Sequence, residues 1–310
     1  MKRLLAEDVK EFKGHDALVY SLAFSPDGKV LATAGFDNAV KLWDFAAAKE
    51  IRTLKGHAGP VYCVAFSKDG KTLASASLDK TIRLWNPADG QFLRPLKGHT
   101  DIVDSVAFNN DGKLLASGSA DKSVRLWDPA NGKEVKNLGT HGNAVYCVAF
   151  SPDGKMLASA GADGIVKLWD VTAQKELKAL KPPAPEKGNP PPPPGSATGV
   201  VFTPDGQQLV SIGQDRFVRI WDIKTGKQIK EMGPTPDDLY GLALARDGKS
   251  LATSGYAGYI TLWDLAGGKQ TASRKLKAFG AYCIAFTPDG KSVVTGHDDH
   301  HCYVNTFASP

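Results

Sequence analysis

Residues 56–97 have the sequence GHAGPVYCVAFSKDGKTLASASLDKTIRLWNPADGQFLRPLK, which contains four short apolar runs separated by turn residues. The first two runs are Val61–Phe66 and Thr72–Ser75, and each ends at a turn that contains an aspartate. Thr81–Trp85 alternates apolar and polar side chains with the period of two that is typical of a half-buried strand. The fourth run is Gln91–Leu96. The stretch therefore predicts four short strands and no helix.

The same pattern recurs seven times along the chain. An Asp-Gly pair returns at intervals of 42, 42, 42, 52, 42 and 42 residues, at Asp27, Asp69, Asp111, Asp153, Asp205, Asp247 and Asp289. A tryptophan lies 16 residues after each of the first six aspartates, and the seventh such position holds Asn305. Repeats of about 40–45 residues with four strands each are typical of β-propeller blades. The sequence thus predicts an all-β fold, a seven-bladed β-propeller with four-stranded antiparallel blades.

The two ends of the chain supply parts of one blade. The last repeat stops at its third strand, near Val304–Phe307. Residues 7–15 (EDVKEFKGH) align with residues 49–57 (KEIRTLKGH), which contain the fourth strand of blade one. We therefore expect Val9–Phe12 to complete blade seven and to close the ring through backbone hydrogen bonds, because a closed ring leaves no blade face exposed. The prediction is a single domain over residues 1–310.

One insertion of ten residues interrupts the regular spacing before blade five. Residues 181–195 include five consecutive prolines, 190–194, which favour polyproline II over sheet. We interpret 181–195 as a proline-rich loop. Three roles fit it: a ligand for a proline-recognition domain, a lid that folds back over the central channel, and a neutral surface excursion.

Two further dipeptides recur with the repeat. Gly-His stands at positions 14, 56 and 98, and Trp-Asp at positions 43, 127, 169, 221 and 263. Through these pairs and the Asp-Gly turns the whole chain resembles the WD-repeat family. In the regularity of blades one to four it also resembles bacterial repeat propellers or a deliberately regularised sequence, which as a designed protein would have no partner.

The resemblance implies a buried hydrogen-bond network in each blade, which joins a histidine, a serine or threonine, a turn aspartate and the tryptophan. In blades one to four these positions hold His15, Thr33, Asp37 and Trp43; His57, Ser75, Asp79 and Trp85; His99, Ser117, Asp121 and Trp127; and His141, Ser159, Asp163 and Trp169. The later blades depart from it at Pro193, Thr235, Ala257, Lys277 and Asn305.

Serine, histidine and aspartate are also the members of a catalytic triad. A triad needs a nucleophile in a cleft, and one triad is enough, whereas here the set recurs in four blades. We interpret the set as structural, satisfying buried polar groups and fixing the turns. We predict no catalytic residue, no cofactor and no enzymatic activity.

The resemblance also implies which side chains face outward at the mouth of the central channel. One repeated position, near the start of the inner strand, holds Tyr20, Tyr62, Asp104, Tyr146, Tyr240 and Tyr282 in six of the seven blades. Another, before the turn aspartate, includes Phe36, Leu78, Tyr256 and Asp298. Aromatic rings beside a few carboxylates suit an extended peptide, including one that inserts an arginine or lysine. The alternative is that the tyrosines only pack between neighbouring inner strands.

Two other signals suggest different classes of function. Residues 297–302, HDDHHC, contain metal-ligand side chains, which makes a metal-dependent binder or enzyme an alternative. Neighbouring strand residues point in opposite directions, however, so we predict no metal site. Lysines follow the Asp-Gly turn in six blades, at Lys29, Lys71, Lys113, Lys155, Lys249 and Lys291. They suit solubility better than nucleic acid, which is not an expected partner.

Composition sets the remaining expectations. The chain has 310 residues, a net charge of +5 and 42% apolar residues, as in a soluble globular protein. It has no apolar run long enough to span a membrane and no signal-peptide pattern at its start, so we expect a monomeric cytoplasmic protein with a protein or peptide partner. Three of the four cysteines share a repeated position with serine and glycine, at Ser21, Cys63, Ser105, Cys147, Gly199, Gly241 and Cys283, which predicts a need for small side chains rather than disulfides.

Overall fold

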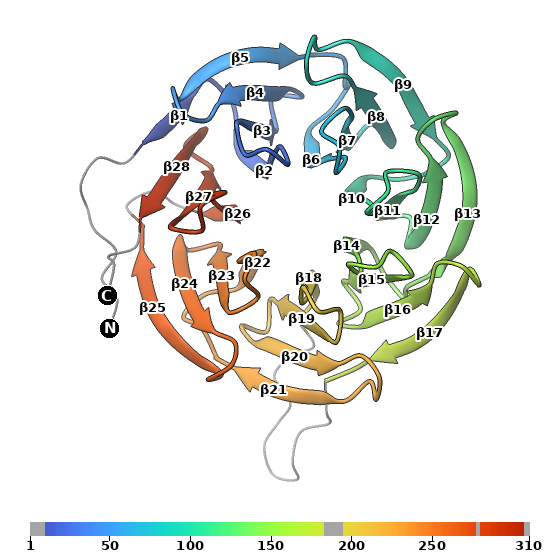
Figure 1. Cartoon of the computed structure of the whole chain (residues 1–310), viewed down its shortest axis with the longest axis vertical. Coiled ribbons are helices and arrows are strands. Elements are labelled where there is room, and N and C mark those ends of the chain that lie inside the picture. The colour runs from blue at the N-terminus through green and yellow to red at the C-terminus, as the bar shows by residue number, and fades with distance from the viewer. Residues whose placement is uncertain (1–9, 183–194, 277–279, 307–310) are drawn as a thin grey trace.

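A computed structural model describes residues 10–182, 195–276 and 280–306 of the chain. The described residues form seven four-stranded antiparallel sheets arranged as blades around a central channel (Figure 1). The predicted all-β, seven-bladed propeller is therefore confirmed. Within these three ranges no helix is long and apolar enough to cross a membrane.

Each blade runs outward from the channel through four strands, which are consecutive in the chain in all blades but the seventh. The innermost strands are β2 (Val19–Phe24), β6 (Val61–Phe66), β10 (Val103–Phe108), β14 (Val145–Phe150), β18 (Ala197–Phe202), β22 (Leu239–Leu244) and β26 (Ala281–Phe286). The second strands are β3 (Val30–Gly35), β7 (Leu73–Ser77), β11 (Leu115–Ser119), β15 (Met156–Gly161), β19 (Gln208–Gly213), β23 (Ser250–Gly255) and β27 (Ser292–His297).

The outer half of each blade follows the same order. The third strands are β4 (Val40–Asp44), β8 (Thr81–Trp85), β12 (Ser123–Asp128), β16 (Val166–Asp170), β20 (Val218–Asp222), β24 (Tyr259–Asp264) and β28 (His301–Thr306). The outermost strands are β5 (Lys49–Leu54), β9 (Phe92–Lys97), β13 (Lys133–Thr140), β17 (Lys175–Leu180), β21 (Gln228–Met232), β25 (Lys269–Lys275) and β1 (Glu11–Lys13).

The turn between the first two strands of a blade shows why Asp-Gly marks each repeat. In blade two the Asp69 carboxylate accepts hydrogen bonds from the Ser67 hydroxyl (2.6 Å) and the Lys71 amide (3.0 Å). Gly70 follows with a φ of 72°, in the left-handed region that glycine adopts without steric cost. The pair therefore fixes where β6 ends and β7 begins.

Each hydrophobic core lies between two neighbouring blades. Ile82 and Leu84 of blade two, for example, pack with Val103, Leu115 and Trp127 of blade three. A single blade has no partner for this face, so the apolar residues of one repeat are buried only when the next repeat stacks against it. The ring is thus the smallest unit in which every such face is covered.

Blade seven contains both ends of the described chain. Its strand order is β1-β28-β27-β26, and β1 pairs antiparallel with β28, with Phe12 opposite Cys302 (Figure 1). The predicted closing strand is confirmed at Glu11–Lys13, and Val9 lies outside the described residues. The third strand starts earlier than the sequence predicted, at His301, because a tight turn with His300 at a φ of 73° ends directly before it.

Long cationic side chains of the outermost segments join several blades to the next. Lys10, beside the closing strand, donates to the carbonyls of Phe45 and Ala46 in blade one. Lys230 of blade five makes the same pair of bonds to Leu265 (3.0 Å) and Ala266 (2.8 Å) of blade six. The N-terminal segment therefore contacts blade one as well as blade seven.

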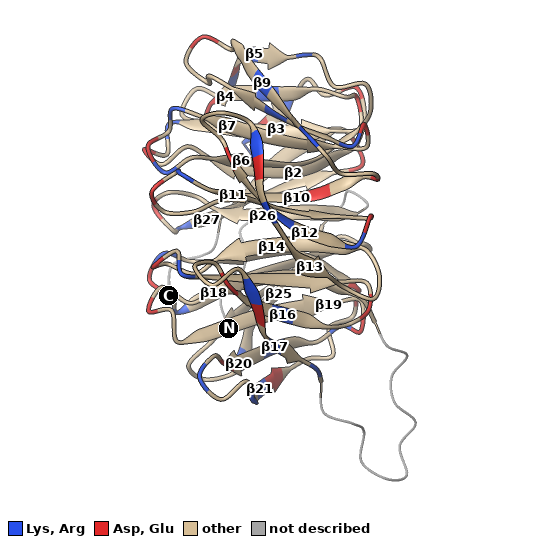
Figure 2. Cartoon of the chain, turned by 90° about the vertical axis from the view of Figure 1, so that its right-hand side faces the viewer, with Lys and Arg blue, Asp and Glu red and all other residues tan. Residues whose placement is uncertain are grey.

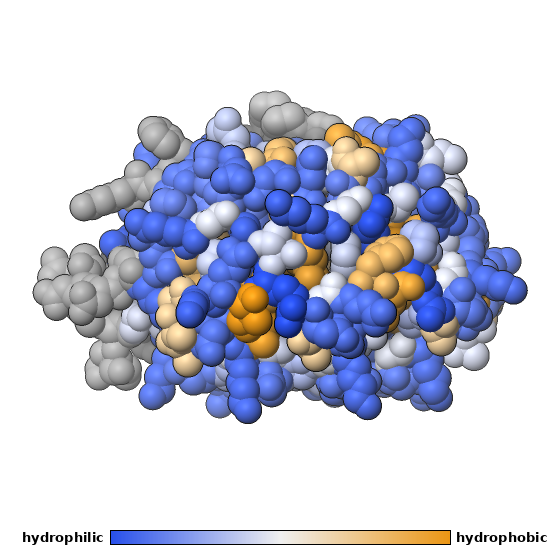
Figure 3. All heavy atoms as spheres, turned by 90° about the horizontal axis from the view of Figure 1, so that it is seen from above, coloured by the Kyte–Doolittle hydropathy of each residue, from blue (hydrophilic) through white to orange (hydrophobic). Residues whose placement is uncertain are grey.

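The circumference of the ring is mixed in character. Figure 2 shows acidic and basic residues interspersed along the outer strands and the turns at both edges. Figure 3 looks onto part of this circumference and shows separate hydrophobic spots among hydrophilic residues. The exposed apolar side chains on outer strands are Ile51, Phe92, Leu93, Val135, Leu177 and Ile229. Isolated residues of this kind are normal on soluble proteins.

Candidate functional site

The repeated histidine, serine and tryptophan form one buried hydrogen-bond chain in each of blades one to four. In blade two the Trp85 indole N–H donates to Ser75 Oγ (2.8 Å), and Ser75 Oγ lies 2.7 Å from His57 Nε2. His57 Nδ1 lies 2.8 Å from Asp79 Oδ2. The serine hydroxyl therefore donates to Nε2, and Nδ1–H donates to the aspartate. The equivalent contacts join His15, Thr33, Asp37 and Trp43; His99, Ser117, Asp121 and Trp127; and His141, Ser159, Asp163 and Trp169.

Solvent access separates this arrangement from a catalytic triad. Ser75 is fully buried and Trp85 and His57 are nearly so. The serine hydroxyl accepts one hydrogen bond and donates another, and because it is fully buried no substrate could reach it from a cleft. This series of hydrogen bonds satisfies polar groups that burial would otherwise leave unpaired, and its contribution is therefore structural.

The protonation of these groups follows from their surroundings. Burial lowers the pKa of His57, His99 and His141, which keeps the imidazoles neutral. Burial opposes ionisation of Asp79, yet hydrogen bonds from Thr81 and His57 lower its pKa to about 2. Blades two, three and four therefore each hold a neutral histidine against an ionised aspartate.

We expect the propeller to lose stability in mild acid. Since the folded-state pKa of these histidines lies below the unfolded value of 6.5, the unfolded chain takes up protons first as the pH falls. The stability that these neutral histidines contribute is fully present above the unfolded pKa of 6.5. It is lost as the pH falls from there through the folded-state pKa. Guanidinium unfolding at pH 7.5 and 5.5 measures the effect, with a lower midpoint expected at pH 5.5. A His57→Asn variant should show a smaller difference, and equal midpoints for the wild type would contradict the assignment.

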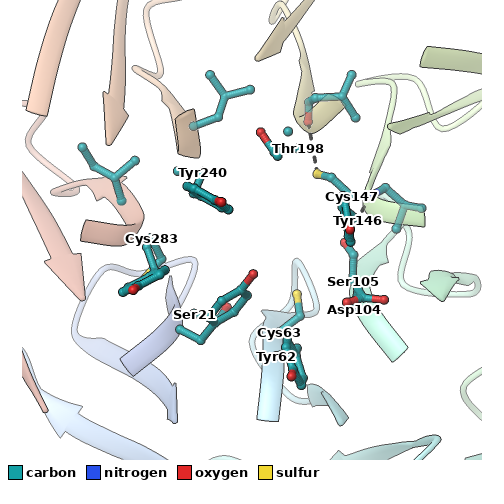
Figure 4. Close-up of a pocket in the computed structure, with 18 of the residues that line it drawn as sticks. Ser21, Tyr62, Cys63, Asp104, Ser105, Tyr146, Cys147, Thr198, Tyr240 and Cys283 are labelled. Carbon is teal, nitrogen blue, oxygen red and sulfur yellow. Dashed lines mark hydrogen bonds between the residues drawn. The ribbon is translucent and has the colours of Figure 1, made fainter. Parts of the chain in front are cut away.

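A cavity of about 510 Å³ occupies the centre of the ring. Its walls are the seven innermost strands, whose side chains point inward in Figure 4. One layer of the wall consists of the small residues Ser21, Cys63, Ser105, Cys147, Gly199, Gly241 and Cys283. The volume is within the range of about 300–1,000 Å³ that is typical of ligand pockets.

The small residues connect adjacent inner strands. Ser21 Oγ accepts from the Val64 amide of the next blade (3.1 Å), and the Cys63 thiol contacts the Val106 carbonyl (3.7 Å). A Cβ on Gly241 of blade six would lie 3.0 Å from Ile284 Cγ2 and 3.2 Å from the Ile284 amide nitrogen of blade seven, besides 2.2 Å from Ser254 Oγ of its own blade. The four cysteines are free thiols. The repeated position therefore has small residues because neighbouring blades approach closely.

Aromatic side chains form an arc at the channel mouth. The ring of Tyr20 stacks on Phe36 (5.6 Å between centroids) and on Tyr282 (5.8 Å), and meets Tyr62 edge-on at 5.1 Å. Tyr282 in turn contacts Tyr240 and Tyr256, both at 6.2 Å. We call these residues the aromatic arc: Tyr20, Phe36, Tyr62, Tyr240, Tyr256 and Tyr282. It spans blades six, seven, one and two.

The other side of the mouth is more polar. Asp104, Tyr146 and Thr198 line it, from blades three, four and five. The Thr198 hydroxyl donates to the Leu239 carbonyl (2.6 Å), and Gln214 donates to the Tyr240 hydroxyl (2.8 Å). Sequence reasoning did not select Thr198 or Gln214 as site residues, although both stand at the repeated positions that supplied the other candidates.

The remaining candidates lie around the rim. Phe36 and Tyr256 reach the mouth through contacts with the arc, and Tyr256 is 61% exposed. Leu78 is exposed and lies outside the cavity wall. Burial raises the pKa of Tyr282, and the nearby charge of Asp298 adds to this effect. The Oδ1 atom of Asp298 is buried without a hydrogen-bond partner. The structure therefore brings most candidates together and leaves Leu78 apart.

A family model described as "WD domain, G-beta repeat" matches the chain at residues 6–44, 48–86, 90–128, 132–170, 193–222 and 272–304. These stretches cover well over half of the sequence. The chain belongs to the WD-repeat family. WD-repeat propellers generally act as scaffolds for protein interactions. Ribosome assembly protein 4 of Saccharomyces cerevisiae is 50% identical to this chain over 36 residues, which is 12% of this chain and 7% of that protein.

Blade six lies in the gap between the matched stretches, yet it is a complete WD-repeat blade in structure. Asp237 replaces the missing turn aspartate: its Oδ2 accepts from the Ala257 amide (2.6 Å), and the carboxyl is buried. The Trp263 indole still donates to Thr253 (3.0 Å). A carboxylate from a different point in the chain thus satisfies the same turn.

Blade seven shows a similar exchange. His297 Nε2 lies 2.7 Å from Thr295 Oγ1, and Asn305 donates to the same oxygen (3.1 Å). His297 stands where blade one has Gly35, and a Cβ there would meet His15. Its ring therefore occupies the space of the histidine that the sequence lacks. Lys277 and Pro193, the residues at the two expected histidine positions, lie outside the described residues, as does 183–194 of the proline-rich loop.

The HDDHHC segment diverges in the structure. His297 faces Thr295, Cys302 packs in the core beside Phe12, and His301 Nδ1 lies 2.7 Å from Glu11 Oε1. Within the described ranges no three histidine, cysteine or acidic side chains come together in a way that would hold a metal ion. His297, His301 and Cys302 are thus each engaged with a different part of blade seven or of the closing strand.

Proposed function

We propose that this WD-repeat propeller is a scaffold that binds a peptide or protein partner at its channel mouth, without a cofactor and without chemistry. The observation that carries the proposal is the aromatic arc, in which six rings contact one another across four blades beside an open cavity. Within the arc Tyr256 is 61% exposed, and Tyr146 on the other side of the mouth is 37% exposed, so both sides offer aromatic surface to a partner.

Physical arguments support a binding role for such a surface. Tyrosine offers a large rigid contact area with a polar tip, and aromatic residues dominate the energetics of many interfaces. Rings held in place by their neighbours lose little conformational freedom when a partner binds. The matched relative is named for an assembly process, which is consistent with a protein that holds others together.

A double variant tests the proposal. Tyr62→Ala with Tyr146→Ala removes one ring from each side of the mouth, and we expect it to abolish capture of the partner from source cells. Both side chains are partly exposed, so the unfolding free energy should fall by less than about 2 kcal/mol. Affinity capture with quantitative mass spectrometry, paired with a melting curve, measures both.

A third tyrosine provides the control. Tyr259 starts β24, away from the channel, with Lys275 over its ring at 5.6 Å. Tyr259→Ala should retain the partner. If the double variant keeps the partner, or unfolds instead of merely losing it, the tyrosines serve packing and the proposal is wrong.

A further inference from the structure

Asp104 interrupts the tyrosines of the channel mouth. It occupies the position that holds tyrosine in five other blades. Among the described residues that line the cavity, Asp104 is the only aspartate, glutamate, lysine, arginine or histidine. Figure 4 shows it at the cavity wall beside Tyr62 and Tyr146. The mouth therefore combines one carboxylate with several aromatic rings.

The Asp104 carboxylate lacks compensation for its charge. Its Oδ2 is hidden from solvent and has no hydrogen-bond partner, and within the described ranges no lysine, arginine or histidine forms a salt bridge with it. The backbone of Ala120 is the one group that favours its ionised form. Burial, with a smaller effect of Asp101, raises the pKa of Asp104 to about 7. A buried carboxylate without a partner is costly and is stabilised by any cation that reaches it.

The rings around Asp104 favour the same kind of ligand. Tyr20, Tyr62 and Tyr146 all lie close enough for its charge to add to the effect of burial in raising their pKa. These phenols stay neutral, and aromatic faces attract cations. An anionic ligand such as a nucleic-acid backbone would meet the carboxylate and the negative faces of the rings, and no lysine, arginine or histidine is among the described residues that line the cavity.

We propose that the channel mouth takes a cationic side chain, an arginine or a lysine of an extended basic segment of the partner, which pairs with Asp104 between the tyrosines. This inference rests on the proposed function and names the chemistry of its ligand. The carboxylate supplies a charged acceptor, and the arc supplies flat faces on which the aliphatic stem and the guanidinium stack.

The other carboxylates of the rim do not offer this site. Asp238 is already paired with Arg216 (3.0 Å) and is only partly buried. Asp298 has an unpartnered oxygen but does not line the cavity. The charge complementarity of the cavity therefore depends on Asp104.

Two matched peptides test the inference. The probes are acetyl-Gly-Arg-Gly-amide and the same peptide with citrulline, which keeps the shape of arginine and removes its charge. Titration followed by NMR should give a dissociation constant about tenfold or more lower for the arginine peptide. In Asp104→Asn the two constants should become equal. Asp238→Asn removes the same charge from the same face and should leave the ratio unchanged.

The outcomes separate this inference from the function on which it rests. Equal binding of both peptides to the wild type, or an unchanged ratio in Asp104→Asn, overturns the cation site. If Asp104→Asn still captures the partner and the Tyr62/Tyr146 double variant does not, the scaffold function stands and only the cation site falls. The cation site and the scaffold function are both supported if both variants lose the partner and the two peptides bind Asp104→Asn with equal dissociation constants.

Discussion

Replacing Phe12 with alanine is expected to lower the free energy of unfolding by about 3–5 kcal/mol, the usual cost of emptying a buried phenylalanine site. Phe12 is 1% exposed and lies in the short strand that closes the ring. Its ring meets Trp43 edge-on at 5.7 Å and stacks on Phe45 at 5.8 Å, so one side chain of blade seven holds two aromatic residues of blade one. Chemical denaturation measures the loss.

Leu93 provides a matched control for Phe12. It also lies on an outermost strand, but its side chain is exposed, so Leu93→Ala should change stability by no more than about 0.5 kcal/mol. Deleting residues 1–13 removes the closing strand entirely and should destabilise the whole ring. A Phe12→Ala variant within about 1 kcal/mol of the wild type, or a deletion variant with an unchanged melting curve, would show that closure does not depend on β1.

Replacing Ser75 with alanine is expected to cost about 2–4 kcal/mol, although only one oxygen is lost. That oxygen accepts from the Trp85 indole and donates to His57 Nε2, so its removal leaves two buried polar groups unpaired. Each unpaired group costs about 1–3 kcal/mol. Equilibrium unfolding, with circular dichroism as the signal, measures the change.

The chain itself supplies the control for Ser75. In blade one Thr33 accepts from Trp43 and bonds His15 in the same way. Ser75→Thr keeps the hydroxyl and should therefore restore most of the stability lost in Ser75→Ala. If Ser75→Ala and Ser75→Thr were equally unstable, packing rather than hydrogen bonding would explain why serine or threonine recurs at this position of the repeat. The hydrogen-bond network would then contribute little to the free energy of unfolding.

The repeat made the fold predictable from the sequence. Because 42-residue spacing places equivalent residues in equivalent positions, one well-defined blade predicts the others, and alignment of the ends predicts β1 beside β28. The same register placed the tyrosines together at the mouth. The blades and the closing strand needed only the order of residues along the chain, whereas the place of the tyrosines at the mouth was implied by the resemblance to the WD-repeat family.

What the register could not predict depends on contacts between positions that are not equivalent. His297 fills the histidine space of blade seven from the second strand, and Asp237 replaces the aspartate of blade six from the preceding loop. The sequence signal for this exchange was His297 itself, which stands at a repeat position that holds glycine or serine in the other six blades. The unpartnered oxygen of Asp104 likewise follows from the distances across the channel, which repeat spacing does not give.

Site-specific photo-cross-linking tests binding at the channel mouth most directly. A benzophenone amino acid placed at Tyr146, on the cavity wall, or at Ile51, exposed on the circumference, keeps the folded ring and samples two different surfaces. We expect irradiation in source cells to link the partner to position 146 and not to position 51. A partner that cross-links from position 51 and not from position 146 would contradict the proposed function.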